Sequence, residues 1–316
     1  MFYFLLRRLF FGICVLFLLS FASFAMMYYI KASPIFASNP QAFSKDLQNE
    51  LEANLNLDKS LLFQYKTWLK SFLSGDLSNS LINSQAVSEL LKERLLNTVV
   101  LGFCALFFLF VLALFLSVLS LAYEGSFLEK LINFISMSFF ALPSFCTALI
   151  LILFFCVYLN LLPSSGAYSL GEDFSFLDRI KHLILPILSL VLSHLAFVLN
   201  FMKSVLKQSL SQYFIDAAFA RGLSKSRIYF HFVLKDSLSS ILACFTSMSV
   251  SFLMSAYVIE AVFSYEGLGS LLIHSITYKD YPVVLALVLF STAFLLCLNA
   301  LLELFCKIMD KRALYA

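Results

Sequence analysis

The stretch VVLGFCALFFLFVLALFLSVLSLA occupies residues 99–122 and contains no charged side chain. A helix rises about 1.5 Å per residue, so roughly 20 apolar residues cross the ~30 Å of hydrocarbon in a bilayer. Inside hydrocarbon, only helices and closed barrels satisfy their own backbone polar groups, and a continuous apolar run of this length favours a helix. The stretch therefore predicts a transmembrane helix.

Five other apolar runs have similar lengths, and each predicts a span: 9–30, 131–159, 183–202, 238–262 and 282–305. The run at 131–159 is longer than one crossing needs, so we expect Pro143 to kink it or the helix to tilt. The first run exceeds the core of a signal peptide, which favours a retained span. Composition agrees, because a chain that is 61% hydrophobic and 13% charged cannot cover its apolar surface in water. The sequence thus predicts an all-α integral membrane protein with six transmembrane helices.

Lysine and arginine indicate which side of the membrane each loop faces. When the N-terminus is placed inside, basic residues are about twice as dense in the inside segments as in the outside ones. This predicts an N-in/C-in protein with a helix at 1–30, an external loop region at 31–96, a membrane core at 97–306 and a cytoplasmic tail at 307–316.

The external loop carries a helical pattern. Asp58 is placed to cap a helix, and Gly75 is placed to end it. Between them, five residues are predicted to share one helical face: Leu61, Leu62, Tyr65, Leu69 and Phe72. Two interpretations stay open: the helix is a small lid packed on the membrane domain, or it is a docking surface for an external partner.

The inside loop at 203–237 has the pattern of a helix, a turn and a second helix. Ile215 and Ala218 recur at helical spacing, and Gly222 is placed to end the first helix in the left-handed conformation. Ser224 is placed to cap a second helix that runs into the fifth span. A partner that pushed on such an exposed element would move that span. The alternative is a basic interfacial loop that holds lipid headgroups.

No pattern in the chain supports catalysis or cofactor binding. None of the nine glycines is followed by lysine, so there is no Walker A phosphate-binding loop, and no catalytic triad or HExxH motif is visible. The seven cysteines lie in apolar runs without metal-ligand spacing or a disulfide framework. We therefore predict that the chain is not an enzyme and has no catalytic, cofactor or metal site. A net charge of +3 gives no reason to expect a nucleic-acid partner.

Polar residues within the fourth and fifth spans are candidates for a translocation path. Ser247, Ser251 and Ser255 are four residues apart and share one helical face. His194 and Asn200 lie in the fourth span. The alternative is structural: serines bond back to their own helix or join helices at about 0.6 kcal/mol each, and the histidine is a hydrogen-bonded packing residue.

The inside loop also carries a recognisable motif. The segment Asp216-Ala217-Ala218-x-x-x-Gly222 resembles the EAA loop of binding-protein-dependent ABC importer permeases, which docks into a groove on the ATPase subunit. Further motifs follow in the family's order over nearly the whole chain: Arg7-Arg8-Leu9, Trp68-Leu69, Gly75-Asp76-Leu77, Leu142-Pro143-Ser144-Phe145, Leu162-Pro163, Leu185-Pro186, Glu260-x-Val262-Phe263, Gly267-Leu268-Gly269 and Asp280-Tyr281-Pro282. As an ordered set they resemble the "B" permeases of the peptide and nickel importers, in the MetI-like superfamily. Glu266 and Lys311 depart from it, since each stands where the family has proline.

The resemblance implies a MetI-like permease of the bacterial inner (plasma) membrane that forms half of the translocation path for peptides or nickel. It implies as partners a homologous second permease, two ATPase subunits, an external solute-binding protein and membrane lipid. The element 211–235 would couple to the ATPase. The residues assigned to this coupling are Asp216, Ala217, Ala218 and Gly222, with Leu223 and Ile228 as contacts in the ATPase groove. A stand-alone secondary transporter or channel is the alternative from another class, and a non-transporting scaffold is a third.

Overall fold

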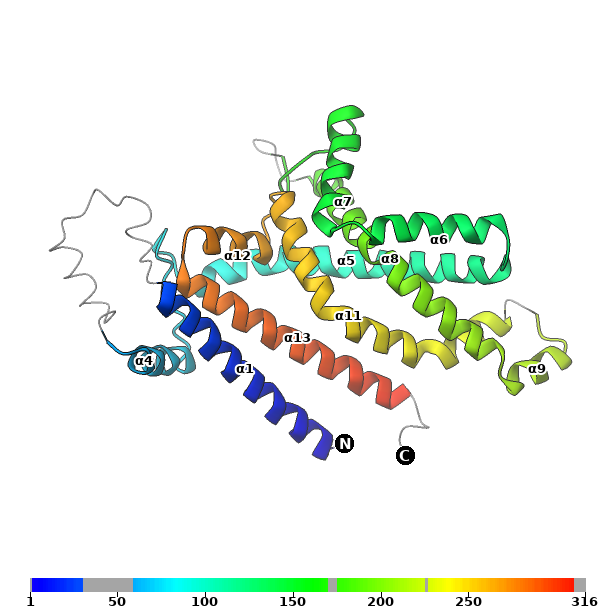
Figure 1. The fold of residues 1–316 in the computed structure, drawn as a ribbon, viewed down its shortest axis with the longest axis horizontal. Helices are drawn as coiled ribbons and strands as arrows, with labels where there is room; N and C mark the ends of the chain where they lie inside the picture. Colours follow the sequence, from blue (N-terminus) through cyan, green and yellow to red (C-terminus); the bar gives the residue numbers. More distant parts are fainter. Residues whose placement is uncertain (1, 31–58, 170–174, 225–226, 310–316) are drawn as a thin grey trace. The chain divides into compact units, whose positions relative to one another are not determined.

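The computed structural model describes residues 2–30, 59–169, 175–224 and 227–309 (Figure 1). Within these ranges the regular structure is helical, apart from one isolated backbone pairing between Asn79 and Ala86. The prediction of an all-α protein is therefore confirmed. The elements in chain order are α1 (Phe2–Ile30), α4 (Leu61–Leu73), α5 (Val87–Ala122), α6 (Phe127–Phe140), α7 (Ser144–Leu151), the π-helical η1 (Ile152–Tyr158), α8 (Phe176–Leu210), α9 (Tyr213–Ala220), the π-helical η2 (Ile228–Val233), α11 (Leu234–Val262), α12 (Leu268–Thr277) and α13 (Tyr281–Met309).

In the described part of the chain, five helices are long and apolar enough to cross a membrane: Leu6–Tyr29, Val87–Ala122, Phe176–Leu210, Ile228–Val262 and Tyr281–Ile308. A sixth crossing is present if α6 and the helix from Ser144 to Tyr158 count together, because this pair passes the same test but bends by 105° (Figure 1). Each of the six predicted spans therefore falls on helix, and the third is a bent pair.

The bend between α6 and α7 follows from Pro143, which takes the N-cap position of α7 with φ −55° and ψ 144°. Proline has no N–H to donate, and its ring disfavours the helical conformation of the residue before it. Of the two alternatives for this long run, a kink is thus the one that the structure adopts. Further along, the helix widens into η1, where the Leu159 N–H donates to the Phe154 carbonyl five residues back, at 3.0 Å.

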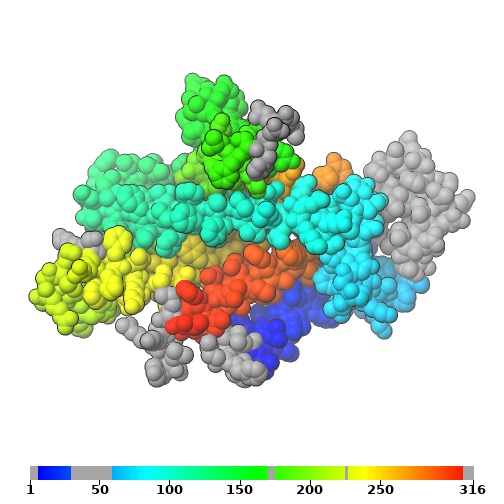
Figure 2. All heavy atoms as spheres, turned by 180° about the vertical axis from the view of Figure 1, so that it is seen from behind, coloured from blue at the N-terminus to red at the C-terminus, as the bar shows by residue number. Residues whose placement is uncertain are grey.

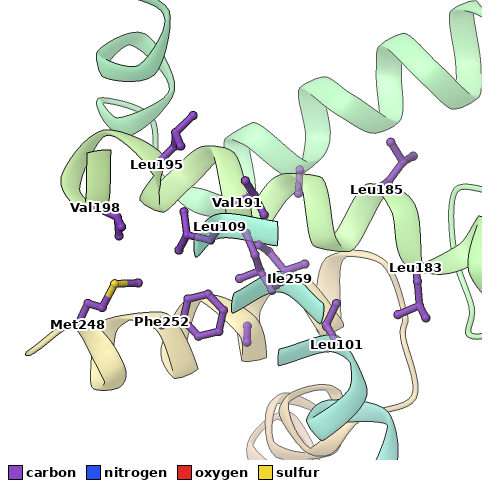
Figure 3. Packing of buried hydrophobic residues seen from close by; sticks show 14 of the residues in the cluster. Leu101, Leu109, Leu183, Leu185, Val191, Leu195, Val198, Met248, Phe252 and Ile259 are labelled. Atoms are coloured by element: carbon purple, nitrogen blue, oxygen red, sulfur yellow. The ribbon is translucent and has the colours of Figure 1, made fainter. Parts of the chain in front are cut away.

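The described helices belong to two compact units, one formed by residues 1–96 with 267–297 and the other by 97–266 with 298–316. In the second unit α8 packs against α6, α7 and α11, and α11 also packs against α7. Leu109 of α5, Val191 of α8 and Ile259 of α11 meet in the buried core of this unit (Figure 3). This core holds together the two spans that flank the inside loop, and so it sets where that loop lies.

In the first unit α4 packs against α1. Tyr65 of α4 is buried, and its hydroxyl lies 2.8 Å from Ser20 Oγ. The rings of Phe21 and Phe24 meet the Tyr65 ring edge-on, with centroids 5.2 Å and 5.6 Å away. Edge-to-face pairs of this kind add to the energy of burial, at about 0.5–1.5 kcal/mol each. The contact favours the interpretation of α4 as a small lid on the membrane domain.

The predicted C-terminal end of α4 is found in the structure, whereas the residue predicted to cap its N-terminus is not described. Gly75 follows the helix with φ +87°, which confirms that a glycine in the left-handed region ends it. Ser60 takes the N-cap position. Asp58, the predicted cap, lies outside the described residues, as do the rest of 31–58 and the tail at 310–316.

A buried carboxylate fastens the segment after α4 to the start of α13. Ser80 Oγ donates to Asp280 Oδ2 at 2.5 Å, and the Leu81 N–H donates to Asp280 Oδ1 at 3.1 Å. The Ile82 N–H donates in turn to Ser80 Oγ at 3.2 Å. Both Asp280 and Ser80 are almost fully buried, so their polar atoms have little access to water. The contact therefore ties two parts of the chain that lie 200 residues apart.

We expect Ser80→Ala to destabilise this unit by about 1–3 kcal/mol, because the buried Asp280 carboxylate loses a charge-assisted hydrogen bond. The measurement is the thermal midpoint of the purified protein in detergent, together with the rate of proteolytic cleavage between residues 74 and 86. Ser74→Ala is the control, since Ser74 is exposed and its hydroxyl donates to the nearby Ser71 carbonyl rather than to a distant segment. Equal midpoints for the two variants would contradict the assignment.

Candidate functional site

The inside loop folds as a short helix that ends in a glycine turn. Gly222 follows α9 with φ +73°. The Leu223 N–H donates to the Ala218 carbonyl at 3.3 Å, and the Gly222 N–H donates to the Phe219 carbonyl at 2.9 Å. These two bonds define a Schellman motif, which satisfies carbonyls that the helix end would otherwise leave unpaired. The predicted left-handed glycine end is confirmed.

The second helix of the loop continues directly into the fifth span. The Ile228 N–H donates to the Ser224 carbonyl at 3.1 Å, and from Arg227 the chain is helical to Val262. Lys225 and Ser226 lie outside the described residues. The first part of this helix is η2, where the Leu234 N–H reaches the Tyr229 carbonyl five residues back. Because no break separates η2 from α11, η2 and the span form one continuous helix.

One face of the loop is buried in a small core of its own. Ile215 and Ala218 of α9 pack with Ile228 and Val233 of η2 and with Leu206 of α8, and Leu223 packs against this cluster. Ile228 is completely buried and Ala218 nearly so, which leaves neither side chain open to a partner. This corrects the prediction of Ile228 as a groove contact. Both residues instead support the element from inside, because a helix of eight residues has little stability in water without such packing.

The opposite face of α9 is exposed. Asp216 and Ala217 lie on it, together with Tyr213 and Ala220, and the side chain of Tyr213 is 91% exposed. Figure 2 shows this part of the chain, in yellow-green, at the surface. Alanines beside a protruding tyrosine leave room for a close approach by a partner. The predicted Asp216 and Ala217 are therefore accessible.

Sequence analysis missed the exposed aromatic side chains of α9. Tyr213 is on the outer face, and Phe214 and Phe219 at its edges are 36% and 45% exposed. A helical projection of 213–220 would have found Tyr213, since it falls opposite Ile215 and Ala218. Exposed aromatic residues are enriched where proteins bind one another, which makes this face a candidate docking surface.

Charged pairs hold the neighbouring helix ends in place. Lys203 of α8 pairs with Glu129 of α6, and Lys207 of α8 pairs with Glu124. At the far side of the loop, Ser209 Oγ donates to Asp236 Oδ2 at 2.9 Å and so joins the end of α8 to the start of α11. These contacts thus fix the C-terminal end of α8, which α9 follows, to α6 and α11.

The candidate path residues do not converge on one site. His194 is buried between α8 and α11, where its Nδ1 donates to the Leu190 carbonyl at 3.0 Å and its ring lies 5.3 Å from that of Phe252. These contacts are those of a packing residue. Ser247 and Ser251 are exposed on α11, and Ser255 is half-buried on the same helix. Their role in a path stays a prediction, although exposure on one chain is what a path shared with a second chain requires.

Asn200 lies apart from the serines, in a groove of about 400 Å³ beside α6 and α8. Ser204 Oγ donates to the Asn200 backbone carbonyl at 2.9 Å, so the serine hydroxyl is satisfied within its own helix. The other groove residues are apolar, namely Met137, Phe140, Ala196, Phe197, Phe201 and Val205. Such a lining suits acyl chains or an apolar helix better than a polar solute.

Comparison with known families agrees with this geometry. The family described as "Binding-protein-dependent transport system inner membrane component" matches residues 110–315, and the N-terminal domain of such membrane components matches residues 1–102. The chain belongs to this family. It is therefore a permease of the ABC transporter class and a multi-pass component of the inner membrane. The resemblance proposed from the motifs is confirmed.

Individual relatives match the permease along its whole length. The oligopeptide transport system permease protein AppB of Bacillus subtilis (strain 168) is 29% identical over 314 residues, which is 99% of each chain. The dipeptide transport system permease protein DppB of Escherichia coli (strain K12) is 27% identical over 331 residues, which is 98% of each chain.

A solved structure shares the fold of the permease. The structure titled as an inward-facing conformation of the MetNI methionine ABC transporter is 18% identical, with a TM-score of 0.53. The match covers 71% of this chain and 98% of that one. At this identity the likeness shows a common fold, which is the MetI-like arrangement expected from the sequence.

Proposed function

We propose that this permease translocates short peptides and that a separate ATPase drives it through α9. The observation that carries the proposal is the construction of the 211–235 element. An exposed helix, Tyr213–Ala220, stands on its own small core and continues through a glycine turn and η2 into the span Ile228–Val262. A partner seated on α9 would therefore act on the span through the core that α9 shares with η2.

In this proposal Asp216, Ala217 and Tyr213 touch the ATPase, while Gly222 sets the angle between α9 and η2. Ala218 and Ile228 hold the element together from inside, while Leu223, which packs against the same cluster but is only half-buried, contacts the ATPase groove. The ATP cycle of the ATPases would push α9 and turn the fifth span, which would switch access to the path between the two sides of the membrane. The chain itself supplies no ATP hydrolysis in this scheme.

The cargo is proposed from the relatives. Their names are those of oligopeptide and dipeptide permeases, at 27–29% identity over nearly the full length. We therefore take peptides as the solute, with nickel as the alternative that the sequence left open. The remaining partners are a homologous second permease, two ATPase subunits and an external solute-binding protein. The alternative of a stand-alone secondary transporter or channel is not favoured, because the family is named for its dependence on a separate binding protein.

The test is solute uptake by a strain that lacks this chain. We expect loss of labelled dipeptide uptake with labelled nickel uptake unchanged, and recovery of dipeptide uptake when the intact chain is restored. Loss of nickel uptake alone would overturn the peptide assignment. Dipeptide uptake by the purified chain in vesicles, without ATPase subunits or ATP, would overturn the proposed energy source.

A further inference from the structure

We propose that α4 is a phospholipid-binding helix that lies in the bilayer leaflet entered by the second half of α1. Its two exposed leucines, Leu62 and Leu73, would contact acyl chains. Lys59, Lys66 and Lys70 would contact the phosphates of anionic headgroups. This leaflet is the external one in the predicted N-in orientation. The inference does not depend on the solute or on the ATPase.

The first argument is the level at which α4 meets α1. Tyr65 bonds to Ser20 and contacts the rings of Phe17, Phe21 and Phe24, with centroids 5.2–6.2 Å away. All four of these α1 residues lie within the apolar span Leu6–Tyr29 rather than beyond its end. A helix packed on this part of a span lies at the level of the bilayer, so its exposed apolar side chains face lipid unless a protein covers them.

The second argument is the split of α4 into two faces. Tyr65, Trp68 and Phe72 stack on one side, with centroid distances of 5.9 Å and 5.3 Å between neighbours. Leu62 was predicted on the same face as Tyr65 but is exposed instead, because it shares another side with Leu73, three turns further along. These two leucines are 68% and 77% exposed. Large leucines exposed to this degree lie beside a span whose second half also exposes apolar side chains, since Leu18 and Met26 are 65% and 67% exposed.

The third argument is charge. The sequence of α4, LLFQYKTWLKSFL, contains two lysines and no acidic residue. Lys59 precedes the helix, and its Nζ lies 4.5 Å above the Phe63 ring. Lysine on a membrane helix keeps its stem in the apolar layer while its ammonium group reaches the headgroups. Basic and apolar side chains arranged in this way are typical of interfacial helices that bind anionic lipid.

A phospholipid fits this surface better than the water-soluble binding protein does. The leucines flank a span, at a level that a protein arriving from solution does not reach. The lysines offer several donors to phosphate oxygens. Continuity with the lipid-exposed face of α1 and complementarity to anionic headgroups therefore point to the same occupant.

The experiment is photo-crosslinking in the assembled transporter within native membranes. p-Benzoylphenylalanine is placed at Leu62, Leu73 or Thr67, one position per variant. We expect phospholipid adducts, identified by mass, at Leu62 and Leu73 in at least several-fold excess over Thr67. Thr67 is the matched control, because it is exposed on the same helix but about 140° away from Leu62. Protein adducts at both leucine positions, or equal lipid adducts at Thr67, would overturn the proposal.

The charge requirement is tested by the composition of the lipid adducts. In the Leu62 crosslinking background, Lys66→Gln together with Lys70→Gln should lower the ratio of phosphatidylglycerol to phosphatidylethanolamine adducts several-fold. Lys92→Gln is the control, because Lys92 is an exposed lysine at the start of α5 that lies outside α4. An unchanged ratio in the double variant would overturn the assignment of anionic lipid.

Discussion

Gly222→Val should leave the permease in the membrane but abolish solute-stimulated ATP hydrolysis by the assembled transporter. Gly222 has φ +73°, a region that costs other residues about 1–2 kcal/mol and costs β-branched residues more. No atom lies within 4 Å of a Cβ built at this position, so the substitution causes no clash. The strain is relieved instead by a change of backbone angle, which turns α9 away from its present direction on η2.

Two control variants separate this effect from general damage. Gly222→Asn should retain most of the stimulation, because asparagine tolerates the left-handed region better than valine does. Gly75→Val introduces the same residue at φ +87°, again with open space around the Cβ, but after α4 rather than α9. It should lower stability without abolishing stimulation. Full stimulation of the Gly222→Val transporter would remove the coupling role of this turn.

Tyr213→Ala is expected to weaken the association of the permease with its ATPase by about 30-fold, which corresponds to ~2 kcal/mol. Tyr213 is the most exposed large side chain of the candidate surface, at 91%, so its loss leaves the folded permease intact. An exposed tyrosine beside small residues is the kind of side chain that anchors a protein interface. The measurement is the dissociation constant of purified ATPase for the permease pair in nanodiscs.

Tyr123→Ala is the matched control for that measurement. Tyr123 is 53% exposed in the loop before α6, and so it tests whether removal of any exposed tyrosine has the same effect. We expect its dissociation constant to stay within about twofold of the unchanged protein, since surface substitutions away from an interface cost little. Equal loss of affinity in both variants would argue against α9 as the docking surface.

The membrane helices could be predicted from the sequence because each depends on a local property, the length of an apolar run. The residues at which the helices begin and end were harder to predict. Helix α5 begins at Val87, well before the apolar run at 99–122, because polar residues there continue the helix. The π-helical turns of η1 and η2 have no signal in single residues. The bond between Ser80 and Asp280 joins distant segments, so no local pattern indicated it.

The sequence predicted the helix–turn–helix form of the coupling element but not which of its side chains are buried and which are exposed. Gly222 was found because a left-handed residue after a helix has a specific preference for glycine. Ile228 was given the wrong role. From sequence alone, an apolar side chain near a turn is equally compatible with a partner's groove and with the chain's own core. The core formed with Ile215 and Val233 decides between them. The same limit applies to His194, whose packing against Phe252 depends on a second helix.

The wide turn at Ile228–Val233 has a consequence for how such transporters can diverge. A π-turn holds one residue more than an α-turn, and each residue rotates a helix by about 100°. Loss of that residue would rotate the start of η2 relative to α11 and so change which of its side chains packs against Ile215 and Ala218 of α9, while the side chains of the bilayer-embedded part keep their places. Deletion of a single residue can therefore change the direction in which the docking face of α9 points. It does so without altering the residues that meet the solute.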